Sequence, residues 1–335
     1  MADYSFASDN TAGACPEAMA AIVAANAGFT SGYATDDVTA RAADLVRGLL
    51  DADADVRFVA SGTAANAVSC AALCRPFESV VAHEHAHICT DETGAPGFFG
   101  QGLGLIPLEG PSGKLDPAAL DAALDQPDVS YRQSPAALSL TNATEYGTLY
   151  TVDEVRALTS RAKANGLAVH FDGARLANAA AAGFDLKAIK TLEVDILIVG
   201  GAKAGASMSE AIVLFDKGLS RRFDARLKQA GQLPSKGRFL SAPWIGLLES
   251  GAWLERSRHA NAMARKLAGL MPFKLRHPQE ANALFVDMDD AALARLRARG
   301  CFVYRFLDGT VRFMCSWATT PEAVEALGAA LKEIA

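Results

Sequence analysis

The sequence lacks the features that mark membrane-spanning and nucleic-acid-binding proteins. Its 335 residues contain no uninterrupted apolar stretch near the ~20 residues that a spanning helix needs. No long run of Lys or Arg is present, and 32 basic against 38 acidic side chains leave a formal charge of −6. Nucleic acids and anionic membranes are therefore poor candidate partners, and we expect neither.

Paired cysteines and a basic N-terminal segment are also missing. The six cysteines are scattered and form no Cys-x-x-Cys pair, so we expect neither a disulfide framework nor a zinc ribbon. The first basic residue is Arg41, and polar residues such as Asp3, Asp9 and Asn10 stand where a signal peptide would be basic and then apolar. We therefore expect a cytoplasmic protein with reduced thiols.

The composition is that of a globular chain with an ample core. Half of the residues are hydrophobic, 21% are charged, and the length suits about two domains. Short apolar runs, most of them bounded by polar or turn residues, alternate with stretches of helical character, which predicts an α/β fold with a mostly parallel central sheet and helices on both faces. The predicted strands are residues 57–60, 80–82, 137–140, 167–171 and 196–199.

Two local patterns add to this prediction. Thr151 and Glu154 form a capping box, which predicts a helix from there to about Gly166. After residue 243 the pattern changes to one long amphipathic stretch, residues 243–270, followed by three short apolar runs, the last two joined by the turn pair Asp308-Gly309. We expect a small C-terminal α+β domain there, with strands at 282–288, 301–306 and 310–314. The expected division is an N-terminal arm at 1–14, a large domain at 15–247 and the small domain at 248–335.

Asp172 and Lys203 are the main candidates for chemistry. Asp172 follows a predicted strand, and ligands of open α/β sheets bind at that strand edge, although an Asp there can also cap the next helix. Lys203 lies among small residues in Gly200-Gly201-Ala202-Lys203-Ala204-Gly205, where the backbone can approach another group closely. A desolvated lysine loses proton affinity and can attack an aldehyde as a free amine. The plainer alternative is a loop lysine that extends to solvent.

Ser61-Gly62-Thr63 and the histidines near residue 85 are weaker signals. Ser61-Gly62-Thr63 joins a predicted strand to a predicted helix, so its free N–H groups and hydroxyls suit a phosphate. In His83-Glu84-His85-Ala86-His87, an extended backbone would place three imidazoles on one face as a metal site needs, while a single imidazole could instead stack on a planar cofactor. We prefer stacking and expect no metal. His170 shares a strand face with Asp172, where it is explained equally well as a buried histidine with a hydrogen-bond partner.

Taken in order, these motifs resemble a fold-type I enzyme that uses pyridoxal 5'-phosphate, and within that class the low-specificity L-threonine aldolases. The resemblance covers nearly the whole chain. It is carried by Ser8-Asp9-Asn10-Thr11, Gly32-Tyr33 with Asp36, Ser61-Gly62-Thr63-Ala64-Ala65-Asn66, Ala86-His87-Ile88, Ala143-Thr144-Glu145-Tyr146-Gly147, His170-Phe171-Asp172-Gly173-Ala174-Arg175, Gly200-Gly201-Ala202-Lys203, Ser235-Lys236-Gly237-Arg238-Phe239 and Arg258-His259-Ala260-Asn261-Ala262-Met263-Ala264.

The resemblance implies a role for each matching residue. Lys203 would form a Schiff base with the cofactor, Asp172 would pair with its pyridine nitrogen, and His87 would stack on its ring, with His85 as the alternative if the register differs. Gly62 and Thr63 would hold the phosphate. Ser8, Arg175 and Arg312 would bind the substrate carboxylate, with Arg175 also at the cofactor. Tyr33, Lys236 and Arg238 match positions that line a site shared between subunits, where Tyr33 would contact the substrate and Lys236 and Arg238 the cofactor. This implies a homo-oligomer, a tetramer built from two dimers.

The implied reaction is retro-aldol cleavage of L-threonine or L-allo-threonine to glycine and acetaldehyde. A base must take the β-hydroxyl proton, and His87, His83, Glu145 or a water are all open to that role at this stage. The lysine motif departs from the Ser-x-x-Lys-Gly pattern of the wider group, which indicates a distinct branch and makes a bulkier substrate such as phenylserine an alternative. Another reaction of the same cofactor, such as β-elimination, is the second alternative, and a non-catalytic metal-binding oligomer with His83, His85 and His87 as ligands is the third.

Overall fold

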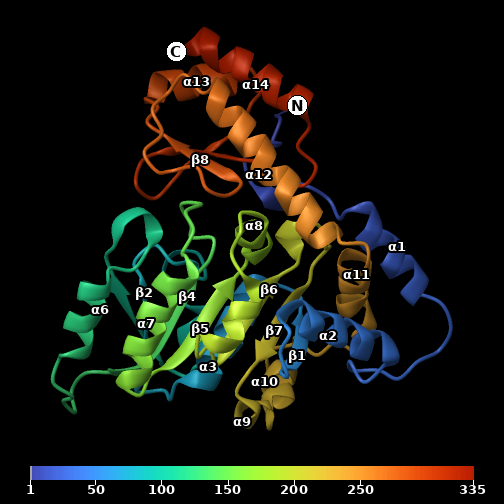
Figure 1. Cartoon of the computed structure of the whole chain (residues 1–335), viewed down its shortest axis with the longest axis vertical. Helices are drawn as coiled ribbons and strands as arrows, with labels where there is room; N and C mark the ends of the chain where they lie inside the picture. Colours follow the sequence, from blue (N-terminus) through green and yellow to red (C-terminus); the bar gives the residue numbers. More distant parts are fainter. Residues whose placement is uncertain (1) are drawn as a thin grey trace.

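Seven short strands form one sheet in the larger part of the molecule (Figure 1). The computed structural model describes residues 2–335, and the strand order is β1-β7-β6-β5-β4-β2-β3. The pairs from β6 to β3 are parallel, whereas β7 is antiparallel to β1 and to β6. The predicted mostly parallel sheet is confirmed, and β3 and β7 are additions to the prediction. The strands are β1 Asp55–Val59, β2 Glu78–His83, β3 Gly104–Leu108, β4 Ser134–Thr141, β5 Ala168–Gly173, β6 Ile196–Gly200 and β7 Glu210–Leu214.

Helices cover both faces of this sheet because side chains alternate along each buried strand. In β6, Leu197 and Val199 pack with residues of α2, α7, α8 and α11, while Ile196 and Ile198 pack with α3 and α10 on the other face. Burial of each such side chain contributes about 1.5–3 kcal/mol. The helices that begin before residue 240 are α1 Pro16–Ala25, α2 Asp37–Leu50, α3 Gly62–Leu73, α4 His87–Thr90, α5 Ala95–Phe99, α6 Pro117–Leu124, α7 Val152–Ala164, α8 Leu176–Ala181, α9 Lys217–Ser220, α10 Phe223–Gln229 and α11 Arg238–Glu249.

Two helix starts follow the sequence signals. The capping box at α7 is present: Glu154 N–H donates to Thr151 Oγ1 at 3.1 Å, and Thr151 N–H donates to Glu154 Oε2 at 2.7 Å. At α3 the hydroxyl of Ser61 accepts from Ala64 N–H at 3.2 Å, so the helix begins directly after β1 and the short connection at residues 60–61. The turn from strand to helix predicted at Ser61-Gly62-Thr63 is therefore confirmed.

The amphipathic stretch from 243 to 270 is two helices, which corrects the expectation of one. Helix α11 ends at Glu249, and α12 (Ala252–Leu270) begins after Gly251. Gly251 has φ of +77°, a conformation that a residue with a Cβ adopts at a cost, so the helical path breaks there. The expected domain boundary after residue 247 falls inside α11, and the interruption between the two helices at Gly251 lies four residues later.

The C-terminal part is a small sheet covered by helices. Its strands β8 (Ala283–Val286), β9 (Tyr304–Arg305) and β10 (Val311–Met314) have the order β8-β10-β9 and are all antiparallel. Gly309, with φ of +81°, donates its N–H to the Phe306 carbonyl at 3.0 Å, which closes the predicted turn between β9 and β10. Strand β9 is shorter than the predicted 301–306. The covering helices are α12, α13 (Asp290–Ala298) and α14 (Pro321–Ile334).

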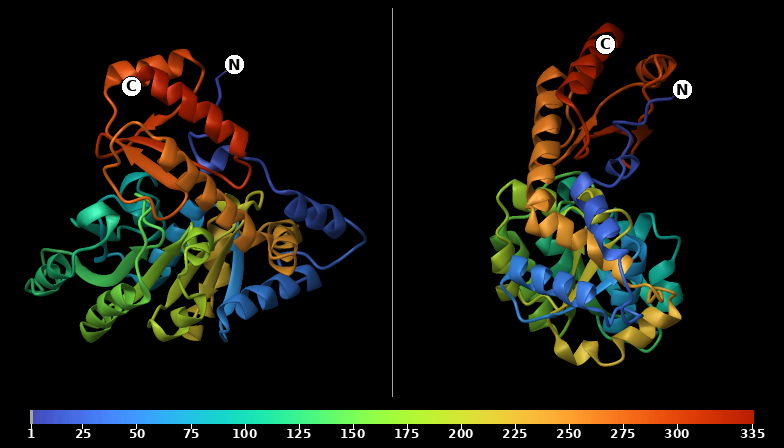
Figure 2. Two further views of the ribbon diagram at one scale, coloured as in Figure 1. Left: turned by 45° about the horizontal axis from the view of Figure 1, so that its top comes forward. Right: turned by 90° about the vertical axis from the view of Figure 1, so that its right-hand side faces the viewer.

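The N-terminal arm lies against this small domain (Figure 2). Asp3 pairs with Cys301, and Met314 N–H donates to the Phe6 carbonyl at 2.9 Å. The side chain of Phe6 is buried in the same apolar cluster as Val311 and Phe313. The arm and the C-terminal region therefore share one core, although they are at opposite ends of the sequence.

The described residues contain neither a membrane-spanning helix nor a disulfide bond. Within residues 2–335, no helix has the length and apolar character that crossing a membrane requires. All six cysteines are within this range, and each is a free thiol.

Two glycines at the end of β6 allow neighbouring backbone segments to pack closely against it. A Cβ added to Gly200 would lie 2.2 Å from the Ala174 carbonyl oxygen, and one added to Gly201 would lie 2.4 Å from the Ser209 carbonyl oxygen. Backbone atoms cannot move aside as a flexible side chain does. The segment that carries Lys203 is thus held against the segment that follows β5.

We predict that Gly200→Ala lowers the free energy of unfolding by about 1–3 kcal/mol, because the methyl group forces the two segments apart. Gly48→Ala is the matched control. Gly48 lies inside α2 with open space around it, so this variant should gain about 0.5–1 kcal/mol. Thermal and urea unfolding of the purified proteins measure both changes, and a G200A protein as stable as the wild type would contradict the prediction.

Candidate active site

The carboxyl ends of β5 and β6 and the start of α3 surround a pocket of about 270 Å³. Asp172 comes from the end of β5, Lys203 from the turn Ala202–Ala204 after β6, and Gly62 and Thr63 from the first turn of α3. This is the sheet edge at which the sequence predicted a ligand. The lining also includes Asn10, Ala60, Ser61, Asn66, His87, Thr141, Ala143, Glu145, Ala174, Arg175, Ala202, Ser207, Met208 and Glu210.

A second pocket, of about 430 Å³, adjoins the first on the side of the small domain. The two share five lining residues: Asn10, His87, Glu145, Arg175 and Lys203. The second is completed by Ser8 and Asp91 and by the β9–β10 hairpin, which supplies Arg305, Phe306, Leu307 and Arg312. The inner pocket, as we call the first, therefore opens into an outer pocket between the sheet edge and the small domain.

A chain of hydrogen bonds joins Asp172 to His87. Asn66 of α3 donates its amide to Asp172 Oδ2 at 2.8 Å and to Glu92 Oε1 at 2.9 Å. The same Glu92 oxygen lies 2.8 Å from His87 Nδ1, and the Glu92 side chain is completely buried. The carboxylate of Glu92 raises the pKa of His87. Glu92 thus holds the imidazole in one orientation with its proton on Nδ1.

Asp172 is buried at the floor of the inner pocket. Its Oδ1 accepts from Ala174 N–H at 2.9 Å, and its Oδ2 accepts from Asn66. The helix that follows, α8, begins after Arg175, so Asp172 is not its N-cap. Both carboxylate oxygens are oriented by fixed donors, which suits a group that must face a ligand in one direction.

Lys203 is partly buried, and its surroundings favour the uncharged amine. Burial, followed by the positive charge of Arg175, lowers the pKa of the Lys203 amine. The turn that carries it is held by Glu210, whose Oε2 accepts from Gly201 N–H at 2.7 Å. Burial raises the pKa of Glu210 to about 7.

Arg175 is engaged by a carboxylate of the N-terminal arm. Its Nε and Nη2 donate to the two oxygens of Asp9 at 2.7 and 3.0 Å, and Asn282 donates to Asp9 Oδ2 at 3.0 Å. Although burial alone would raise it, the Arg175 guanidinium lowers the pKa of Asp9 to about 2. Nη1 is the terminal nitrogen of Arg175 that this pair leaves for a ligand.

Arg312 has N–H donors that no described residue accepts. Its Nη2 donates to the Ala7 carbonyl at 3.1 Å, while its Nε is buried without a hydrogen-bond partner among residues 2–335. Burial, followed by the charge of Arg175, lowers the pKa of Arg312. Two guanidinium groups with unused donors therefore border the outer pocket, together with the hydroxyl-bearing Ser8.

Tyr33, Lys236 and Arg238 do not line either pocket of their own chain. They lie beside one another, because Tyr33 N–H donates to the Ser235 carbonyl at 3.0 Å and Gly237 packs on Ala34. The Tyr33 ring is 51% exposed and lies under Lys228 Nζ. These three predicted site residues are thus grouped in space but separate from the other predicted residues.

The three histidines near residue 85 point to different partners, which corrects the arrangement that an extended backbone would give. The chain turns after His83, and His87 begins α4. His83 Nε2 lies 3.0 Å from the Gly110 carbonyl, and His85 Nδ1 lies 2.7 Å from the Tyr146 hydroxyl. Only His87 of the three borders the pockets. In the described part of the chain, no group of three or more His, Cys, Asp or Glu side chains is placed to hold a metal ion.

His170 is completely buried beneath the site. Its Nδ1 lies 2.9 Å from the Ser139 hydroxyl, and its Nε2 has no partner among the described residues. Burial lowers the pKa of His170 to about 4, so the ring is neutral near pH 7. It is therefore a buried core histidine with one hydrogen-bond partner, as one of the two sequence interpretations gave.

Sequence reasoning did not assign roles to Asp9, Asn66, Glu92 and Glu210. Asp9 and Asn66 are inside motifs that were noticed, next to residues that were given roles. Glu92 follows His87 by five residues and could have been noticed as an acidic residue between two short helices. Glu210 carries no signal in the sequence, because its contact with Gly201 depends on the antiparallel pairing of β7 with β6.

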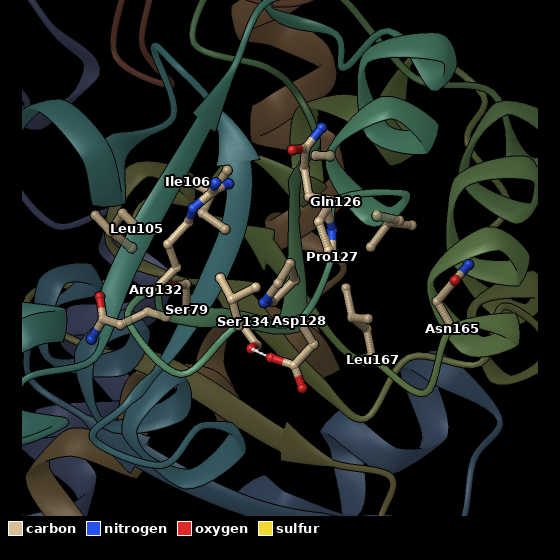
Figure 3. A pocket seen from close by; sticks show the side chains of 15 residues that line it. Ser79, Leu105, Ile106, Gln126, Pro127, Asp128, Arg132, Ser134, Asn165 and Leu167 are labelled. Carbon is tan, nitrogen blue, oxygen red and sulfur yellow. Dashed lines mark hydrogen bonds between the residues drawn. The ribbon is translucent and has the colours of Figure 1, made fainter.

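A further pocket, of about 570 Å³, lies at the opposite edge of the sheet (Figure 3). It is bordered by the amino ends of β2 and β4, near Ser79 and Ser134, and by Leu167 before β5. Ser134 donates to Asp128 at 2.5 Å across its floor. None of the predicted site residues contributes to it.

Comparisons with known proteins agree with the geometry. The family model described as beta-eliminating lyase matches residues 5–291. A low specificity L-threonine aldolase of Pseudomonas aeruginosa is 46% identical over 96% of this chain and 95% of its own length.

Solved structures give the same result. A Leishmania major threonine aldolase has a TM-score of 0.92 at 31% identity and covers 99% of this chain and 100% of its own. Serine palmitoyltransferase of S. paucimobilis has a TM-score of 0.72 at 16% identity over 100% of this chain and 86% of its own, which shows a shared fold alone. The predicted fold class and resemblance are confirmed, and the chain belongs to the beta-eliminating lyase family.

Proposed function

We propose that this protein is a carbon–carbon lyase that uses pyridoxal 5'-phosphate to cleave L-threonine and L-allo-threonine to glycine and acetaldehyde. The observation that carries the proposal is the pair of adjoining pockets, one with Lys203 and Asp172 and the other with Arg312. The near-full-length likeness to proteins described as threonine aldolases supports the same substrate class. Related β-hydroxy-α-amino acids fit the same chemistry.

The inner pocket has the donor set that this cofactor requires. A Cβ built on Gly62 meets nothing within 4 Å, so the start of α3 offers open space and free N–H groups for a phosphate. Asp172 suits the ring nitrogen, Lys203 the aldehyde, and His87 the face of the ring. When bound, pyridoxal phosphate supplies an aldehyde for an amine and a protonated ring that accepts the electron pair released at Cα.

Each residue of the inner pocket contributes a defined effect. Asp172, oriented by Asn66 and Ala174, keeps a proton on the ring nitrogen, because a nearby carboxylate stabilises the cation. The lowered pKa of Lys203 increases the fraction of free amine, which is the nucleophilic form. Glu92 prevents the His87 imidazole from rotating away from the pocket.

The outer pocket suits the rest of the substrate. Arg312, Ser8 and Nη1 of Arg175 would bind the α-carboxylate, and a planar guanidinium is well matched to that group. By fixing the carboxylate, these residues would orient the substrate so that its Cα–Cβ bond, and not another bond on Cα, is aligned for cleavage. Phe306 and Leu307 form an apolar wall, which favours acceptance of phenylserine as well.

The proposal also includes a homo-oligomer, a tetramer of two dimers, in which Tyr33, Lys236 and Arg238 complete the site of a neighbouring subunit. Two observations support it: these residues lie away from their own chain's pockets, and Arg238 Nε is buried without a partner among residues 2–335. Apolar side chains nearby in the sequence, Val23 and Phe29, are strongly exposed in the single chain. The free cysteines support a cytoplasmic location.

The reaction is tested by loading the protein with pyridoxal phosphate and quantifying the products from L-threonine. We expect glycine and acetaldehyde in equal amounts, and no product from Lys203→Ala, which lacks the amine. Borohydride should fix the cofactor on the wild-type peptide that contains Lys203, as mass spectrometry would detect. Ammonia and 2-oxobutyrate as the main products would instead indicate β-elimination, and parallel assays with L-phenylserine measure the range of aldehydes.

Arg312→Ala should lower kcat/KM for L-threonine about 10- to 100-fold, because a charged hydrogen bond contributes about 1.5–3 kcal/mol. Arg312→Lys should retain part of the activity, since it keeps the charge but not the planar fork. Arg299→Ala, which removes an exposed arginine of the same domain paired with Glu333, is the control. Steady-state kinetics that place R312A level with R299A would rule out the assignment.

Shared sites are tested by mixing two inactive variants. Lys203→Ala and Arg238→Ala each damage every site in their own homo-oligomer. Random hybrid dimers restore about one quarter of the sites, because one site in each hybrid receives Lys203 from one subunit and Arg238 from the other. We expect that fraction of wild-type activity after co-expression. Activity no greater than the sum of the separate variants would show that each chain completes its own site.

A further inference from the structure

Glu145 is the one carboxyl group bordering both pockets that has an unpaired oxygen among the described residues. It lies four residues after the end of β4. Its Oε1 accepts from the backbone N–H of His87 at 3.0 Å, which fixes the carboxyl group in place. Its Oε2 is buried and has no hydrogen-bond partner within residues 2–335. A buried acceptor is ordinarily paired, so this oxygen calls for a partner that the chain itself does not supply.

His83 and His87, the two histidines considered as the base, are less suited to that role than Glu145. His83 is outside both pockets, and its Nε2 is taken up by the Gly110 carbonyl. His87 borders both pockets, but its Nδ1 is held by the Glu92 carboxylate at 2.8 Å, which also raises the pKa of His87. Protonation of the other ring nitrogen would leave the imidazole with no free lone pair. Among the side chains that the sequence left open, Glu145 remains as the acceptor.

Burial and the nearby charges bring the pKa of Glu145 close to neutral pH. Burial raises the pKa of Glu145 to about 7, and the negative charge of Asp172 on β5 acts in the same direction. The backbone N–H and the charge of His87 on α4 act against this shift. Glu145 also has charge interactions with Arg175, which follows β5, and with Cys89 of α4. An acid with its pKa near the working pH is well suited to take up and release a proton.

We propose that Glu145 is the catalytic base that accepts the proton of the substrate's β-hydroxyl group through Oε2. The inference rests on the proposed function, because it assigns a residue to one step of that reaction. The step requires a carboxylate at the junction of the pockets, which is the place that Glu145 occupies.

The step balances in atoms and electrons. The O–H bond of the substrate breaks and its proton joins Glu145 Oε2, while the electron pair of that bond forms the C=O bond of the aldehyde. The Cα–Cβ bond breaks, and its pair remains at Cα until Cα takes up a proton to become the CH₂ of glycine. One proton is lost and one is gained, so Glu145 returns to its starting state once its proton has passed to water.

The experiment compares Glu145→Gln with the wild type in the cofactor-loaded enzyme. Gln keeps the acceptor for His87 N–H but cannot take up a proton. We expect kcat for L-threonine to fall about 10²- to 10⁴-fold. In the wild type, kcat/KM should rise with pH through about 7, because the carboxylate is the active form, and this rise should be absent in E145Q.

A second readout needs neither cofactor nor substrate. The infrared difference between unloaded wild type and E145Q should contain a carboxylic-acid C=O band that disappears as the pH rises through about 7. Subtracting E145Q removes the contribution of Glu210, whose pKa is also about 7. A Glu145 that stays ionised down to pH 5 would overturn the proposal.

Controls separate a base from a structural residue. Glu84→Gln removes a nearby carboxyl group outside both pockets and should leave the rate and pH profile unchanged. Glu145→Ala should recover activity with added formate, which a merely structural role would not allow. If E145Q keeps the wild-type rate and profile, Glu145 is not the base, and the aldolase assignment stands. If the wild type itself yields no glycine and acetaldehyde, the proposed function fails instead, and with it the role given to Glu145.

Discussion

The buried ion pair between Asp9 and Arg175 holds together three parts of the molecule. Asp9 belongs to the N-terminal arm, Arg175 follows β5 at the sheet edge, and Asn282, which donates to the same carboxylate, precedes β8 of the small domain. Loss of one partner of such a pair typically costs about 3–5 kcal/mol, because the other charge remains buried. The outer pocket is bounded by these same three parts. Its shape therefore depends on this one interaction.

The site concentrates acidic groups around few cations. Glu92, Asp172 and Glu210 are all buried within it, and each has a fixed N–H or amide donor. Burial raises the pKa of Glu92 and raises that of Glu210 to about 7. The free amine of Lys203 is favoured by the same desolvation. Burial thus sets the direction of the pKa shift for these three groups, whereas a charged partner sets it for His87 and Asp9.

The sequence was informative where function depends on a strand end or a turn. Asp172 and Lys203 were found because each follows a short apolar run, and parallel strands bring such residues to one edge. Glu92 and Asn66 were not assigned, because their contact joins α3 to the loop between α4 and α5 and no local pattern encodes it. The break at Gly251 was missed because hydrophobic periodicity continues on both sides of it. The roles that we propose for Tyr33 and Arg238 involve other subunits, and contacts between subunits leave no pattern in the sequence of one chain.

The position of the N-terminal arm has a consequence for biosynthesis. Within this sequence, the arm is synthesised before its partners in the small domain: the hydrogen bond from Arg312 to the Ala7 carbonyl spans 305 residues. Phe6 has no apolar core to enter until β10 has been translated. The large sheet contains all of its own strands by residue 214 and can form before that point. During translation, the strands that surround the inner pocket are thus available before the β9–β10 hairpin that completes the outer pocket, and docking of the arm on the small domain follows.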